Sequence, residues 1–113
     1  MSRTFKAFAA ALLATISSVS LFATPPAERS FTGEVGDAMC GRKHMEGETA
    51  AECTRACVAH GSKFALIVGD KIYTLETADK AALTTLDKQA GKAATVVGTL
   101  DGDNIEVSTV TAK

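Results

Sequence analysis

The sequence predicts a mainly β fold, a small five-stranded barrel with one helix inserted after strand 1 and a second helix between strands 3 and 4. Two observations predict it. Runs of β-branched and aliphatic residues recur along residues 30–113, and glycine–aspartate turns join them in pairs, which is typical of hairpins. Two other segments predict helices on either side of the first hairpin, the first from a capping box and the second from apolar residues at helical spacing.

The first strand is expected over residues 30–37, where apolar residues and glycines alternate with polar ones in the period of two that suits a strand. A polar loop follows. Thr49 and Glu52 then match a capping box, in which each side chain accepts a hydrogen bond from the other residue's backbone amide. A helix is therefore expected from about residue 50 to 60, with Gly61 to end it.

The remaining elements follow in order. Gly69-Asp70 is expected to join two strands, and Asp101-Gly-Asp103 another two. A second helix between these hairpins carries Asp79 in its first turn and is ended by Gly91. The expected ranges are 63–68 and 71–75 for the first hairpin, 78–90 for the helix, and 92–100 and 104–111 for the second hairpin. Apart from the first helix, this is the element order of an OB-fold barrel, so the fold class is an OB-like barrel.

The first 23 residues have the layout of a secretory signal peptide. Arg3 and Lys6 give a basic start, and a run of small and apolar residues without an acidic residue follows. Residues 24–29 are then a short tether, and 30–113 form the folded domain. The protein is expected to be exported, either periplasmic or secreted, with no stable membrane span after cleavage. An uncleaved anchor is the alternative, because the apolar run is near the lower limit for crossing a bilayer.

Charge and composition limit the function. Without the signal peptide the chain keeps 10 of its 12 basic residues and all 13 acidic ones, a formal net charge of −3, and it keeps three aromatic residues. Barrels that bind nucleic acid need a basic groove and aromatic platforms for the bases, so no nucleic-acid partner is expected. The sequence has no nucleophile elbow, no paired histidines on a helix and no phosphate loop, so the protein is not expected to be an enzyme.

All three cysteines and one of the two histidines lie within 18 positions, in the stretches CGRKH and CTRAC. Cys53 and Cys57 are four residues apart on the predicted helix, so they lie one turn from each other on the same side. Cys40 and His44, in the preceding loop, can fold over that side. Three sulfurs and one nitrogen make a tetrahedral zinc set, and four protein ligands are typical of a structural site.

Other ligands and another ion fit the same stretch. Copper is a rival to zinc, because thiolate and imidazole also suit copper and Met45 adds a soft ligand. His60 falls on the same side of the predicted helix as both helical cysteines and is an alternative ligand. Asp37, at the end of the first strand, could orient the ring of His44 by a hydrogen bond, although an aspartate is equally common there as a turn residue.

A disulfide without any metal is the main alternative. In an exported protein Cys40 can pair with Cys53 or Cys57 and fasten the inserted helix to the barrel, which leaves one thiol unpaired. A bond between the two helical cysteines is disfavoured by disulfide geometry. A thiol redox protein is a further alternative, but the pair is Cys-x3-Cys and not the Cys-x2-Cys redox motif.

Taken together, these features resemble a group of small exported bacterial domains with an OB-like barrel. The shared pattern is a first strand ending in Gly-x-x-x-Asp-x-x-Cys-Gly, then a histidine, two helical cysteines and two terminal strand motifs. Here it corresponds to Gly33, Asp37, Cys40-Gly41, His44, Cys53 and Cys57, then VVGTL from Val96 and IEV from Ile105. The resemblance implies the fold and the cysteine–histidine pattern, but no activity. The expected function is a binding or structural domain for zinc or copper, with an unidentified envelope protein or small ligand as partner, or a disulfide-stapled interaction domain with no cofactor.

Overall fold

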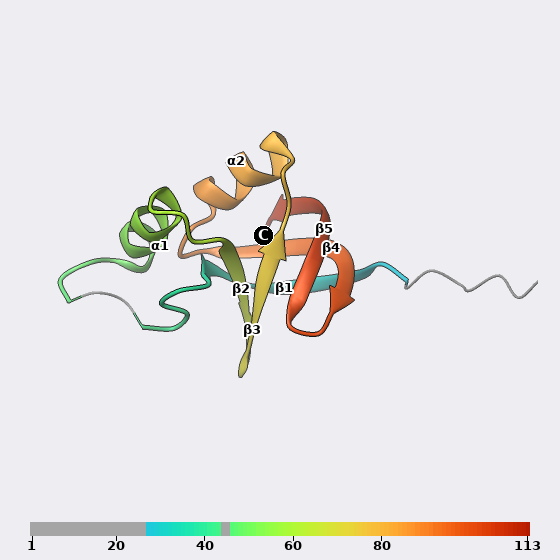
Figure 1. Cartoon of the computed structure of the whole chain (residues 1–113), viewed down its shortest axis with the longest axis horizontal. Coiled ribbons are helices and arrows are strands. Elements are labelled where there is room, and N and C mark those ends of the chain that lie inside the picture. Colours follow the sequence, from blue (N-terminus) through green and yellow to red (C-terminus); the bar gives the residue numbers. More distant parts are fainter. Residues whose placement is uncertain (1–26, 44–45) are drawn as a thin grey trace, which may run out of the picture.

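The structure is a computed structural model and describes residues 27–43 and 46–113 (Figure 1). The predicted signal peptide, the first part of the predicted tether, His44 and Met45 lie outside the described residues. Within the part of the chain that is described, no helix is both long and apolar enough to cross a membrane.

Strands and helices alternate along the chain in the predicted order, with a hairpin after each helix. The elements are β1 Arg29–Asp37, α1 Ala50–Ala59, β2 Phe64–Val68, β3 Lys71–Glu76, α2 Lys80–Lys88, β4 Ala93–Asp101 and β5 Asn104–Ala112. The predicted mainly β class is therefore confirmed, and so are the positions of the two helices after β1 and between β3 and β4.

The five strands form one closed sheet, in the order β1-β2-β3-β5-β4. β1 closes it, because residues 29–34 pair with β4 and residues 34–37 pair with β2, both antiparallel. Among the described strands, β3 and β5 are the one parallel pair. Each of the five described strands thus has two neighbours, although β3 and β5 pair over only three residues each, 74–76 and 104–106.

The second helix is shorter than the sequence predicted. The expected range was 78–90, but α2 runs from Lys80 to Lys88, because Asp79 is its N-cap and accepts a hydrogen bond from the backbone amide of Ala82. An N-cap residue lies outside the helical dihedral range and so fixes where the helix begins. β1 also begins at Arg29, one residue inside the predicted tether.

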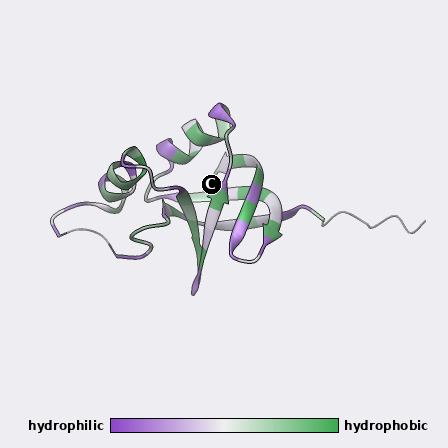
Figure 2. Ribbon diagram, viewed as in Figure 1, coloured by the Kyte–Doolittle hydropathy of each residue, from purple (hydrophilic) through white to green (hydrophobic). Residues whose placement is uncertain are grey.

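Apolar side chains from the strands and from α2 fill the closed sheet. Figure 2 shows apolar segments interspersed with polar ones along the strands, as expected when one face of each strand points inward. The buried core comprises Phe31, Val35, Phe64, Leu66, Leu75, Leu86, Ala94, Val96 and Ile105. Leu86 is the member that comes from a helix, so α2 is held to the sheet by this side chain.

The segment between α2 and β4 positions α1 beside the end of β1. The amide of Gly91 donates to the carbonyl of Val35 at 2.8 Å, and the amide of Val35 donates to the carbonyl of Lys92 at 2.9 Å. A Cβ atom on Gly91 would lie 2.9 Å from the backbone nitrogen of Ala51, so the same segment also packs on the first turn of α1. This contact fixes the helix that carries two of the three cysteines.

Gly33 is a close-packing point of the sheet, and we expect Gly33→Ala to lower the free energy of unfolding by about 3 kcal/mol. A Cβ there would lie 2.2 Å from the carbonyl oxygen of Ile67, which is strand backbone and cannot move aside without opening the pairing of β1 and β2. Gly102→Ala is the control. Gly102 has φ +61 but open space around it, so only backbone strain of about 1 kcal/mol is expected. Equal urea midpoints for the two variants would contradict this account.

Candidate metal centre

Asp37 and Cys40 are positioned by the sharp turn that ends β1. The Asp37 carboxylate accepts hydrogen bonds through Oδ2 from the backbone amides of Met39 and Cys40, at 3.0 and 2.9 Å. The Gly41 amide donates to the Asp37 carbonyl at 3.0 Å. The carboxylate is almost completely buried, at 1% exposure. The turn thus places an acidic side chain and the Cys40 thiol on the same inner side of the loop.

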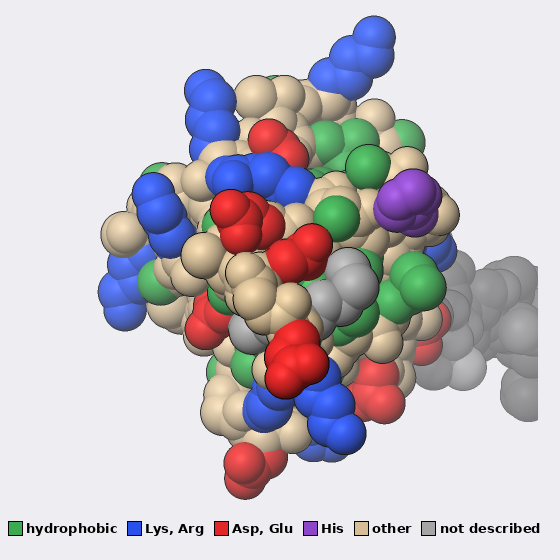
Figure 3. Space-filling model, turned by 90° about the vertical axis from the view of Figure 1, so that its left-hand side faces the viewer, with side chains coloured by type: hydrophobic (Ala, Val, Ile, Leu, Met, Phe, Trp, Pro, Cys, Tyr) green, Lys and Arg blue, Asp and Glu red, His purple; other side chains and the backbone are tan. Residues whose placement is uncertain are grey.

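The described part of this loop is anchored to the sheet on both sides. The Ala38 amide donates to the carbonyl of Lys63 at 2.9 Å, and the Arg42 guanidinium donates to the carbonyl of Gly69 in the β2–β3 turn. Its exposed charged residues are of both signs: Arg42, Lys43, Glu46 and Glu48. On the face of the molecule shown in Figure 3, acidic and basic side chains are likewise interspersed.

Cys53 and Cys57 are presented by α1. Thr49 and Glu52 form the predicted capping box, with both reciprocal hydrogen bonds present, so the helix begins at Ala50 as expected. Cys53 is fully buried and Cys57 is 7% exposed. The helix therefore turns both thiols inward, toward the end of β1.

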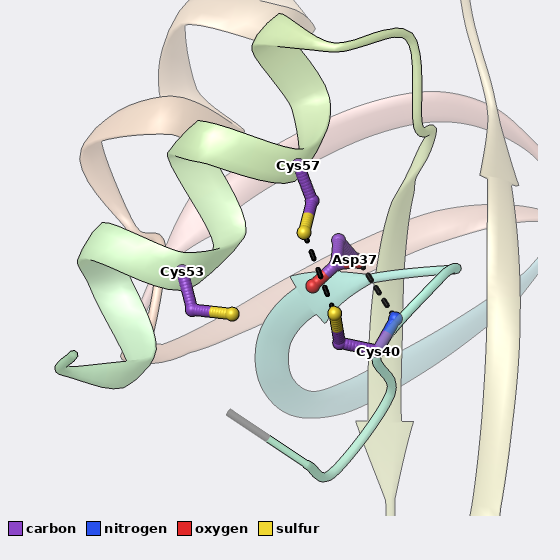
Figure 4. A group of neighbouring side chains, drawn as sticks. All are labelled: Asp37, Cys40, Cys53 and Cys57. Carbon is purple, nitrogen blue, oxygen red and sulfur yellow. Dashed lines mark hydrogen bonds between the residues drawn. The ribbon is translucent and has the colours of Figure 1, made fainter. Parts of the chain in front are cut away.

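The three thiols and the Asp37 carboxylate converge on one point (Figure 4). One ligand atom from each of the four residues can be chosen so that all lie within 4.8 Å of one another. The Cys40 and Cys57 sulfurs are 3.4 Å apart. Four ligand atoms about 2.3 Å from an ion at the corners of a tetrahedron lie about 3.8 Å apart. The four side chains are thus close to the spacing that a tetrahedral ion requires, and the group could hold a metal ion.

All three cysteines are free thiols in the described structure. The hydrogen bond to Cys40 raises the pKa of the Cys57 thiol, and burial and the Asp37 carboxylate raise it further, to about 12 from 9.0. For Cys40 the hydrogen bond with Cys57 lowers the thiol pKa, but burial, Asp37 and Cys53 outweigh it, so that pKa is raised too. A bound divalent ion would have the opposite effect and lower the pKa of both thiols, because it binds thiolates and displaces their protons.

The raised pKa of Cys57 predicts that the metal-free, reduced protein loses stability in alkali. In the unfolded chain this thiol ionises near its ordinary pKa of 9.0, whereas in the folded protein it stays neutral up to about 12. Its contribution to stability is therefore complete below pH 9.0 and lost as pH rises toward about 12. Urea midpoints measured across this range should fall more steeply for the native protein than for Cys57→Ser. Parallel curves would contradict the assignment.

The structure brings together the three predicted cysteines, but the rest of the predicted set differs. His44 lies outside the described residues, so its place among the ligands stays a prediction. His60 is the exposed C-cap residue of α1 and is not part of the group. Asp37, predicted only as a hydrogen-bond partner of His44, offers its own carboxylate to the centre. Asp37 is two residues after Val35, and alternate residues of a strand point to the same face, so the sequence places the Asp37 side chain on the inward face of β1. This spacing is the signal that could have identified Asp37 as a ligand.

Comparisons with known proteins add no further constraint, since no family model, curated protein or solved structure matches the chain.

Proposed function

We propose that this protein is an exported, non-catalytic OB-like domain that binds one zinc ion at Asp37, Cys40, Cys53 and Cys57. The proposal is carried by one observation: one ligand atom from each of these four residues can be chosen so that all four lie within 4.8 Å of one another. Three of the four atoms are sulfurs, and they come from all three cysteines of the chain. The chain has only three cysteines, and the fold places all three thiols next to a buried carboxylate.

The topology supports an OB-like barrel. A closed five-stranded sheet with a helix between the third and fourth strands is the architecture of that fold. The inserted segment after β1 then has a definite role. It adds a loop and a helix, and these carry all three thiols while Asp37 comes from the end of β1 itself. An ion bound there would tie the insertion to the barrel.

The donor set favours zinc over copper. Zinc accepts thiolate and carboxylate ligands together in tetrahedral sites, whereas cuprous copper prefers soft donors, and the buried Asp37 carboxylate is a hard donor. Four protein ligands leave no open position for a substrate or for water, which supports a structural rather than a catalytic site. An ion bound to these thiols would also protect them from oxidation in the oxidising compartment expected for an exported chain.

The proposal is tested by titrating the reduced, metal-free protein with zinc and with cuprous ion under a competing chelator, followed by cobalt substitution. We expect one zinc per chain and a cobalt spectrum with sulfur-to-cobalt charge transfer and tetrahedral bands. Copper instead of zinc in the protein recovered from its own compartment would move the assignment to copper handling, because thiolates bind cuprous ion tightly and affinity alone does not decide between the two ions. No binding of any of the three ions would refute the proposal.

A further inference from the structure

We propose that Cys40 and Cys57 form a thiol–disulfide switch, which releases the bound ion when an organic disulfide oxidises the pair and allows rebinding after reduction. This inference rests on the proposed metal site and adds its regulation. It concerns a defined pair among the three thiols, and the structure distinguishes that pair by distance, by secondary structure and by exposure.

Distance and secondary structure single out Cys40 and Cys57. Their sulfurs are 3.4 Å apart and in hydrogen-bond contact. A disulfide bond is about 2.05 Å long, so the sulfurs have to approach by roughly 1.4 Å. Cys40 lies in a loop and Cys57 on α1, so we expect a shift of the loop to allow this approach (Figure 4). Cys53 and Cys57 share one helix, where the side-chain directions do not suit a disulfide.

Exposure sets the order of the two chemical steps. Cys40 is partly exposed, whereas Cys57 is 7% exposed and Cys53 is fully buried. An external disulfide therefore meets Cys40 first. The Cys40 thiolate attacks one sulfur of that disulfide, forms a mixed disulfide and expels one thiolate. The Cys57 thiolate then attacks the Cys40 sulfur and expels the second thiolate. The two cysteines have lost two electrons, and the oxidant, now two thiols after protonation, has gained them.

Oxidation of this pair removes two ligands at once. Of the four residues of the centre, only Cys53 and Asp37 then remain, and two ligands do not make a closed zinc site. The same three thiols thus support two mutually exclusive states, one holding an ion and one holding a disulfide with Cys53 left free. Reduction by a dithiol restores the thiolates and the site.

The test is to load the full domain with zinc, add oxidised glutathione, and follow free zinc with a chromogenic chelator while digested samples are mapped by mass spectrometry. Reduced glutathione is the control for simple chelation. We expect one zinc released per Cys40–Cys57 cross-link, with Cys53 still open to alkylation, and zinc uptake again after reduction. In metal-free Cys57→Ser the reaction should stop at a mixed disulfide between Cys40 and glutathione.

The outcomes separate this inference from the metal site itself. If the reduced protein binds zinc but oxidation links Cys40 to Cys53, or forms the Cys40–Cys57 bond while zinc stays bound, the switch is refuted and the site stands. Zinc release with all thiols still reduced refutes it as well. If the reduced protein binds no metal, both proposals fail. Because mapping of the native protein needs no variant, a poorly folded Cys57→Ser would not change these readings.

Discussion

Cys53→Ser is expected to lower the zinc affinity by about 100-fold or more. Loss of a residue that merely supports a ligand costs about 10- to 100-fold in metal affinity, so loss of a ligand should cost at least as much. Cys53 is fully buried on α1, so water cannot readily take its place at the ion. A serine hydroxyl is a poor substitute because it does not ionise near neutral pH. The measurement is a zinc titration against a competing chelator.

Thr54→Val is the matched control for this variant. Thr54 is the next residue of the helix, is 1% exposed, and has a hydroxyl with no hydrogen-bond partner among the described residues. Replacing that hydroxyl with a methyl group should leave zinc affinity unchanged and leave the protein as stable or more so, since an unpaired buried hydroxyl is unfavourable. The account of Cys53 fails if Cys53→Ser binds zinc as tightly as Thr54→Val does.

Asp37 is expected to contribute both to zinc affinity and to the stability of the turn after β1, and two substitutions separate these contributions. Asp37→Asn keeps an oxygen to accept from the amides of Met39 and Cys40 but loses the charge, so it should fold normally and bind zinc about 10- to 100-fold more weakly. Asp37→Ala removes the acceptor as well. It leaves two amides of the turn without their partner, and the metal-free protein should lose about 2 kcal/mol of stability besides.

Glu34→Gln serves as the control, because Glu34 is an exposed carboxylate on the same strand and should not affect either measurement. The two readouts are zinc affinity and the urea midpoint of the metal-free protein. If Asp37→Asn retained full zinc affinity, Asp37 would be a turn residue alone, and His44 would be the better candidate for the fourth ligand.

Local sequence signals predicted the order and most of the bounds of the helices and strands well, because capping and turn residues mark where many of these elements begin or end. The capping box at Thr49 and Glu52 fixed the start of α1, and Gly69-Asp70 fixed the first hairpin, where Val68 pairs with Lys71. The length of α2 was predicted less well, since Asp79 can be read as a first-turn residue or as an N-cap and only the backbone decides. Pairing of β3 with β5 depends on contacts distant in sequence, which no local pattern specifies.

The candidate centre could be predicted only in part. The i, i+4 spacing of Cys53 and Cys57 placed both thiols on one side of α1, and the loop does bring Cys40 to them. The role of Asp37 depends on the turn after β1, whose hydrogen bonds to Met39 and Cys40 aim the carboxylate inward. Spacing alone does not reveal that direction. His60 fits the same helical side on a wheel but lies at the C-cap, where the helix has ended.

The most direct test is elemental analysis of the protein recovered from its own compartment, with a free-thiol count on the same sample before and after denaturation. The account predicts one equivalent of zinc per chain, no disulfide, and three thiols that become reactive when the protein is denatured and the metal is chelated. Metal-free protein with a disulfide and one free thiol, which takes up no zinc after the disulfide is reduced, would contradict it, because the cysteines would then serve as a covalent staple and not as ligands.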